Sequence, residues 1–132
     1  MSKPFRTILY GFLTWLIPFL AGFPFIDQQG NYLIDEIFFK TIMIVVGALV
    51  GTALAVFYLR DIKENFLKEA VLVGLLWLAI NWILDLIMVM TGFFPMDVRE
   101  YFMNIGLRYL SMPIYLTGLG LVLRGRGEAD IS

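Results

Sequence analysis

The sequence predicts an all-α membrane protein, a four-helix transmembrane bundle that forms one membrane domain over residues 1–132. Three observations predict this class. Hydrophobic residues make up 60% of the chain and charged residues 16%, against about 45–50% and 25% in soluble domains. The mean hydropathy is +0.82. Four apolar stretches, each about 20 residues long, match the roughly 30 Å of hydrocarbon that a membrane helix must cross.

The predicted spans follow one another with short connections, at about 5–25, 37–59, 70–90 and 101–123. Each span is too long and too uniformly apolar for an ordinary soluble helix. Short connections make neighbouring spans antiparallel. The alternation of apolar and polar residues that barrel strands need is missing. We therefore expect an antiparallel bundle, followed by a flexible cytoplasmic tail at 124–132.

The distribution of lysine and arginine predicts the orientation of the bundle across the membrane. One side of the four-span arrangement holds Lys3, Arg6, Arg60, Lys63, Lys68, Arg124 and Arg126. The loops on the other side are acidic, around Asp27, Glu36 and Glu100. The positive-inside rule then places both termini in the cytoplasm. The first span has no clean cleavage site, so we expect it to be retained as a helix.

The composition excludes several kinds of chemistry. The chain has no cysteine and no histidine, so disulfides, thiolate nucleophiles and the usual transition-metal ligands are ruled out. A net charge of −1 without a basic run argues against nucleic acid as a partner. Phosphate-binding, nucleophile-elbow and metalloprotease motifs are missing. We expect a protein of the lipid bilayer with no enzyme activity, no metal and no cofactor.

Polar residues inside the third and fourth spans are the strongest functional signal. Asn81 and Asp85 are four residues apart and share a helix face, as do Asn104 and Arg108. Counting 1.5 Å per residue puts Asp85 about 10 Å and Arg108 about 12 Å from the outer ends of their helices. An unpaired charge there costs at least about 2.5–3.5 kcal/mol. The sequence therefore predicts an Asp85–Arg108 ion pair supported by the two asparagine amides.

Two interpretations of these residues stay open. Ionisable residues inside membranes mark solute and proton pathways, so Asp85, Arg108, Asn81, Asn104 and Lys40 are candidates for a solute or proton site. In this site Asp85 would respond to a proton or cation, and Arg108 would hold its charge state or bind an anion. The alternative is a structural clasp that fixes helix register, in a non-transporting accessory or assembly subunit.

Small residues follow one side of the second span. Gly47, Gly51 and Ala55 recur at intervals of four, the pattern that lets helices approach closely. Lys40 has nearly the same angular position as Gly47, and it points either to this packed side or to the interface beside Glu36. The seam could pack within the chain or between chains. Because four helices enclose little space, we expect transport to require a homodimer or a larger homo-oligomer.

The sequence also contains a weak internal repeat. A shift of 64 residues aligns DEIFFK at 35–40 with REYFMN at 99–104, and it aligns Arg60 with Arg124. Such a repeat is expected of two tandem helical hairpins in the same orientation, an arrangement found in transporters. Chance similarity between apolar helices is the alternative explanation.

Two segments carry a resemblance, WLAINWILD at Trp77–Asp85 and EYFMNIGLRYLSMP at Glu100–Pro113. They resemble small uncharacterised four-span membrane proteins of prokaryotes that have an intramembrane Asp and an IGLRY…P segment. The resemblance covers about a third of the chain. Because no activity is known for that group, it implies only the fold and a prokaryotic inner-membrane location. Small multidrug exporters have a membrane-embedded Glu in helix one, which this chain lacks.

Overall fold

The computed structural model describes residues 3–27, 29, 31–94 and 96–131. In chain order its helices are α1 (Lys3–Gly22), the 3-10 turn η1 (Phe23–Phe25), α2 (Glu36–Leu59), α3 (Phe66–Met90), α4 (Val98–Asn104), the 3-10 turn η2 (Gly106–Leu110) and α5 (Ser111–Ile131). Among the described residues, four segments are long and apolar enough to cross a membrane: α1 with η1, α2, α3, and η2 with most of α5. The predicted all-α four-helix bundle is confirmed.

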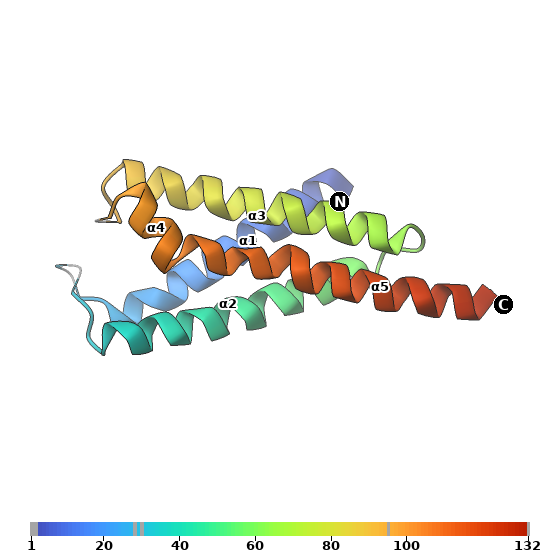
Figure 1. Ribbon diagram of the computed structural model, residues 1–132, viewed down its shortest axis with the longest axis horizontal. Helices are drawn as coiled ribbons and strands as arrows, with labels where there is room; N and C mark the ends of the chain where they lie inside the picture. Colours follow the sequence, from blue (N-terminus) through green and yellow to red (C-terminus); the bar gives the residue numbers. More distant parts are fainter. Residues whose placement is uncertain (1–2, 28, 30, 95, 132) are drawn as a thin grey trace.

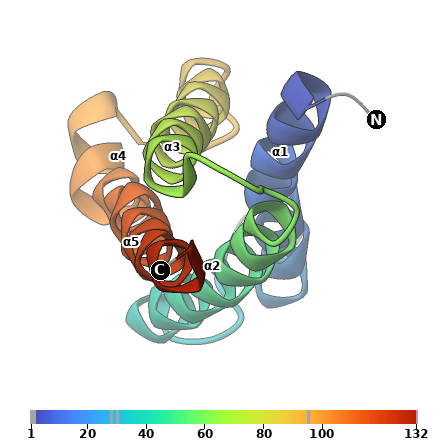
Figure 2. The ribbon, with the colours of Figure 1, turned by 90° about the vertical axis from the view of Figure 1, so that its right-hand side faces the viewer.

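Both termini lie at one end of the bundle, and the α1–α2 and α3–α4 connections lie at the other (Figure 1). We call these the terminal end and the loop end. Viewed from the terminal end, the helices follow the order α1, α2, α5, α3 around the bundle (Figure 2). α2 and α3 therefore lie on opposite sides, and the connection between them crosses the terminal end.

Polar side chains define where the helices begin. The Asp35 carboxylate accepts a hydrogen bond from the Phe38 backbone N–H at 3.2 Å, directly before α2. The Asp97 carboxylate accepts one from the Glu100 backbone N–H at 2.8 Å, directly before α4. Such caps satisfy backbone donors that lack a partner in the first helical turn. Before α3, Asn65 has a φ of +56°, a left-handed conformation that asparagine tolerates better than most residues.

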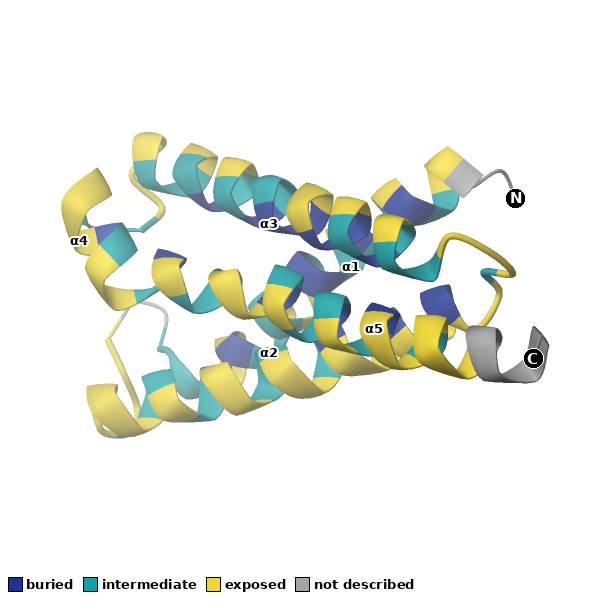
Figure 3. Cartoon of the chain, turned by 45° about the vertical axis from the view of Figure 1, so that its right-hand side comes forward, coloured by how far each residue is buried: buried dark blue, intermediate teal, exposed yellow. Residues whose placement is uncertain are grey.

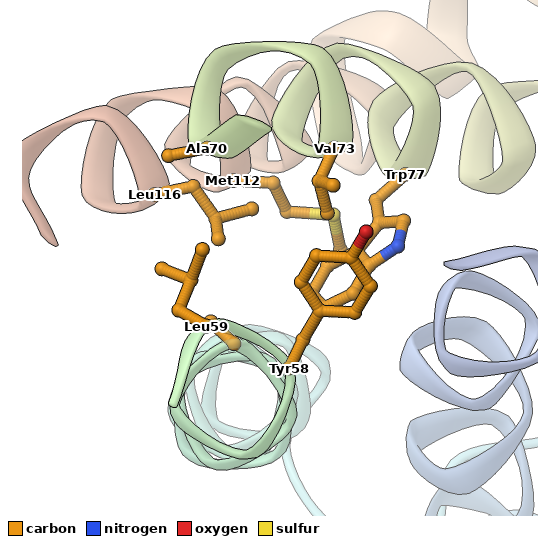
Figure 4. Packing of buried hydrophobic residues seen from close by; sticks show 8 residues of the cluster. Tyr58, Leu59, Ala70, Val73, Trp77, Met112 and Leu116 are labelled. Atoms are coloured by element: carbon orange, nitrogen blue, oxygen red, sulfur yellow. The ribbon is translucent and has the colours of Figure 1, made fainter. Parts of the chain in front are cut away.

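The hydrophobic core lies in the half of the bundle next to the terminal end. Its buried side chains come from α2, α3 and α5, and they meet around Trp77 and Leu116, both with 0% exposure (Figure 4). Tyr58 of α2 packs edge-on against the Trp77 ring. Buried residues face the bundle axis, and large apolar residues such as Leu49 and Ile114 cover its outside (Figure 3). An apolar exterior is what a lipid-facing surface requires.

The fourth predicted span is not one continuous helix, contrary to the expectation for 101–123. α4 ends at Asn104, η2 follows as a 3-10 turn, and α5 starts at Ser111. α4 runs at an angle to α5 (Figure 1). α5 then continues to Ile131, so helical backbone covers most of the expected tail. The flexibility of that tail stays a prediction.

Two local contacts explain the break before α5. Pro113 has no backbone N–H, and its ring would collide with the carbonyl of Tyr109 if a regular helix continued through this point. In addition, the Trp82 indole N–H of α3 donates a hydrogen bond to the Gly106 carbonyl at 2.8 Å. This bond gives the carbonyl a partner outside the helix ladder. The pattern of apolar residues predicts the span, but it does not reveal the effect of Pro113 or the hydrogen bond from Trp82.

Helices α3 and α5 approach each other closely at a glycine. A Cβ atom on Gly74 would lie 2.7 Å from the Pro113 Cα, so only glycine fits at this crossing.

The predicted seam on α2 is closely packed at one end and open at the other. Ala55 is fully buried, and a side chain on Gly51 would overlap the Tyr115 hydroxyl of α5. A Cβ on Gly47 would meet nothing within 4 Å. The seam therefore packs within the chain at its terminal half only.

Candidate functional site: a cavity at the loop end

A cavity of about 1050 Å³ enters the bundle from the loop end, between α1, α2, the end of α3, α4 and η2. Aromatic rings of α1, η1 and the α3–α4 turn form much of its wall. Its charged lining residues are Asp27, Glu36, Lys40, Asp85, Glu100 and Arg108. Four of the five residues predicted as a solute site therefore line one cavity: Asp85, Arg108, Asn104 and Lys40.

Asp85 lies deep in this cavity, with 2% of its surface exposed. The Trp15 indole N–H of α1 donates a hydrogen bond to one carboxylate oxygen at 2.6 Å. The Tyr101 hydroxyl of α4 donates one to the other oxygen at 2.5 Å. Because Asp85 itself belongs to α3, this carboxylate joins three helices through two neutral donors, and the Tyr109 phenol of η2 also interacts with it. Bonds of this kind offset part of the cost of burying a carboxylate.

Arg108 makes no ion pair with Asp85, which corrects the sequence prediction. Its Nη2 atom donates a hydrogen bond to the Asn104 backbone carbonyl at 3.0 Å. Its Nε atom is buried and has no hydrogen-bond partner. The predicted pairing assumed a continuous helix from residue 101. Because the chain turns at Ile105, Tyr101 rather than Arg108 reaches the Asp85 carboxylate.

Lys40 points into the bundle, where it contacts Asn104, and it also remains close to Glu36 on α2. Its Nζ atom donates a hydrogen bond to the Asn104 side-chain oxygen at 3.0 Å and lies 3.4 Å from a carboxylate oxygen of Glu36. The Asn104 amide donates in turn to the Glu100 carbonyl at 2.8 Å. Asn104 therefore contacts Lys40 through its side chain and Arg108 through its carbonyl. The two cations share one wall of the cavity.

Asn81 lies outside the cavity lining, on the side towards the terminal end. Its amide donates hydrogen bonds to the Thr14 hydroxyl at 2.8 Å and to the Trp77 carbonyl at 2.9 Å. Its side-chain oxygen is buried without a partner. Asn81 shares a face with Asp85 as predicted, but it connects α3 to α1 and supports no Asp85–Arg108 pair.

Contacts in the terminal half of the bundle close the cavity on the side of the terminal end. The hydroxyls of Thr7 and Tyr58 are 2.8 Å apart, and the Trp77 indole N–H donates to the Thr7 carbonyl at 3.0 Å. Arg6 forms an ion pair with Asp61 and donates to the Phe57 carbonyl at 2.7 Å. These contacts join α1 to α2 and α3 beside the hydrophobic core. The cavity is therefore open at the loop end and blocked towards the terminal end.

The α1–α2 connection shapes the mouth of the cavity. The Asp27 carboxylate accepts hydrogen bonds from the backbone N–H groups of Gln29 and Asn31, at 2.9 and 2.8 Å. An isolated antiparallel bridge joins Ile26 to Tyr32. Partial burial raises the pKa of the Tyr32 phenol, and the nearby negative charge of Glu36 raises it further. These turns hold an aromatic and acidic rim at the loop end.

The sequence pattern did not identify Trp15 and Tyr101, the two donors to Asp85. Aromatic residues of membrane helices commonly serve as packing and interface anchors, and their hydrogen-bonding atoms carry no sequence signal that selects Asp85. A buried Trp or Tyr needs a partner for its polar atom, and the intramembrane carboxylate is such a partner. In the described residues, no group of three acidic side chains is placed to hold a metal ion.

Comparison with protein-family models, with curated protein sequences and with solved structures finds no match to this chain. The resemblance to small four-span prokaryotic proteins therefore stays a prediction.

Proposed function

We propose that this small integral membrane protein binds a small solute or ion in the loop-end cavity and carries it across the membrane. The observation that carries the proposal is a cavity that reaches Asp85 and Arg108 at membrane depth. Charged groups within a membrane are costly and mark pathways for polar cargo. A structural clasp alone requires no open space beside it.

The blocked terminal half supports a transport cycle rather than an open channel. A transporter exposes its site to one side at a time, so one side must be closed in each state. Here the Thr7–Tyr58 and Arg6–Asp61 contacts close the terminal side. We propose that the termini are cytoplasmic in a prokaryotic inner membrane, because the basic residues gather at that end. The cavity would then face outwards.

A second candidate is a non-transporting accessory or assembly subunit. One observation favours it: the Asp85 carboxylate uses both oxygens to join α1, α3 and α4. This is what a clasp would do. The two functions differ in whether the cavity ever opens to the terminal side.

Cysteine labelling distinguishes the two functions, since the native chain has no cysteine. Met43 lines the cavity, whereas its neighbour Ile44 is half exposed on the outside of the bundle. Met43→Cys should react with an impermeant thiol reagent applied to the loop end, and Ile44→Cys is the matched lipid-facing control. For a transporter, Met43→Cys should also react from the terminal side in vesicles of opposite orientation. Labelling from the loop end alone would support the accessory role, and no labelling from either side would refute a solute cavity.

A further inference from the structure

The guanidinium of Arg108 faces the cavity without an acidic partner. Its one hydrogen bond goes to the Asn104 carbonyl, and its Nε atom is buried and unpaired. Within the described part of the chain no carboxylate lies within ion-pair distance of it. A guanidinium carries five N–H donors in a planar fork. Most of that donor capacity is therefore unused beside an open space.

In this arrangement Asp85 attracts Arg108 electrostatically but lies beyond ion-pair distance of it. Trp15 and Tyr101 already donate to its two oxygens. Lys40, joined to the same wall through Asn104, adds a second cation, which is shared with Glu36. Hydrogen bonds between ionised groups are strong in a low-dielectric site. An anionic group from outside the chain would satisfy Arg108 in a way that no described residue does.

The opposite wall is aromatic. Phe19, Phe93 and Phe94 line the cavity, and their ring centroids are 5.8 to 6.5 Å apart. The Trp15 ring stacks on Phe19 with centroids 4.8 Å apart, which continues this surface down to Asp85. Aromatic surfaces of this kind stabilise an apolar or aromatic body.

The acidic groups limit how much negative charge the cavity can accept. Asp27, Glu36 and Glu100 line it nearer the mouth, and together with Asp85 they outnumber the two cations. A nucleotide or polyphosphate would meet several like charges on the way in.

We infer that the cavity binds an organic anion with a single charge and an apolar body, whose anionic group is received by Arg108 and Lys40. This inference rests on the proposed function, because it names the ligand of the same site. The chemistry fits a solute carboxylate from water and a fatty acid from the bilayer alike, and the experiment separates these two sources.

The test measures binding to the full chain in phosphatidylcholine nanodiscs. Naphthoate is the water-borne anion, naphthamide its uncharged counterpart, and oleate supplied in the bilayer is the lipid-borne anion. Wild type should bind naphthoate, oleate or both, and naphthoate more tightly than naphthamide if the source is water. Arg108→Gln should weaken anion binding about tenfold or more, the loss expected for a charge-assisted hydrogen bond. Arg108→Lys should restore part of it.

Arg60→Gln is the matched control, because Arg60 is exposed at the terminal end and lies over Phe57, away from the cavity. It should leave binding unchanged. Equal affinity for naphthoate and naphthamide together with no Arg108-dependent oleate binding would overturn the inference. So would unchanged anion binding in folded Arg108→Gln. If Arg108→Gln fails to fold, the anion affinities of Arg108→Lys and Lys40→Gln are compared with that of wild type. Weaker anion binding by these variants supports the inference, and unchanged binding overturns it. A cavity that is labelled at Met43→Cys but shows no anion preference would refute this inference and leave the proposed function standing.

Discussion

The Asp85 carboxylate receives its hydrogen bonds from an indole N–H and a phenol O–H, both neutral. Neutral donors satisfy a buried acceptor without adding a second charge that must also be kept from lipid. They leave the nearby Arg108 without an ion pair among the described residues. A carboxylate and a guanidinium on consecutive spans thus serve separate contacts, although both line the same cavity.

Double-mutant cycles measure which partner Asp85 uses. Asp85→Asn and Tyr101→Phe should each lower the free energy of unfolding by about 1–3 kcal/mol, because each leaves a buried polar group poorly satisfied. Combined, they should cost clearly less than the sum, since both remove the same contact. Asp85→Asn with Arg108→Gln should show a smaller coupling energy, because the two charges attract each other without forming an ion pair. Unfolding in detergent measures these variants together with the single Arg108→Gln variant, and stronger coupling to Arg108 than to Tyr101 would contradict the assignment.

The spacing of polar residues predicted part of this site. Asn81 and Asp85 share a buried face, as their interval of four predicted, and Lys40 and Arg108 both contact Asn104. The partners of Asp85 could not be predicted, because Trp15 is 70 residues away in the sequence. Helical periodicity reports which side of a helix is polar, and it contains no information on which neighbouring side chain meets it.

The elements show the same division. The first three spans end within a few residues of their predicted bounds, because length and apolarity dominate there. The fourth is divided into α4, η2 and α5. A proline near the start of α5 and one tertiary hydrogen bond from Trp82 cause this break. Hydropathy averaged over a whole span does not register either of them. The consequence is functional, since the break brings Tyr101 to Asp85. The two tandem hairpins are present, whereas their origin by duplication stays a prediction.

Two glycines of α2 provide a test of helix packing with a built-in control. Gly51→Leu should lower the free energy of unfolding by about 1–3 kcal/mol, because the new side chain collides with Tyr115. Gly47→Leu should change it by less than about 0.5 kcal/mol, because nothing lies within 4 Å. Unfolding titrations in detergent give both values. Equal losses of unfolding free energy at the two positions would show that the seam packs along its whole length. A change in oligomer mass confined to Gly47→Leu would show that the seam packs between chains at Gly47.

At the scale of the whole molecule, one chain already encloses the cavity. Helices α1, α2 and α3, together with α4 and η2, supply its lining. The expectation that four helices enclose too little space was therefore wrong as an argument for an oligomer, and the homodimer itself stays a prediction. The cavity with its charged side chains occupies the loop half, and the hydrophobic core occupies the terminal half. This division gives the bundle one open and one closed side.

Water access at the bottom of the cavity tests this account most directly. Ile105 lines the cavity beside Arg108, whereas Leu107 is 56% exposed on the outside of the bundle at a similar depth. In sealed vesicles, an impermeant thiol reagent applied from the loop side should label Ile105→Cys and leave Leu107→Cys unreacted, because a thiol in lipid does not ionise. Labelling of Ile105→Cys no faster than that of Leu107→Cys would contradict a water-filled cavity and with it the proposed solute site.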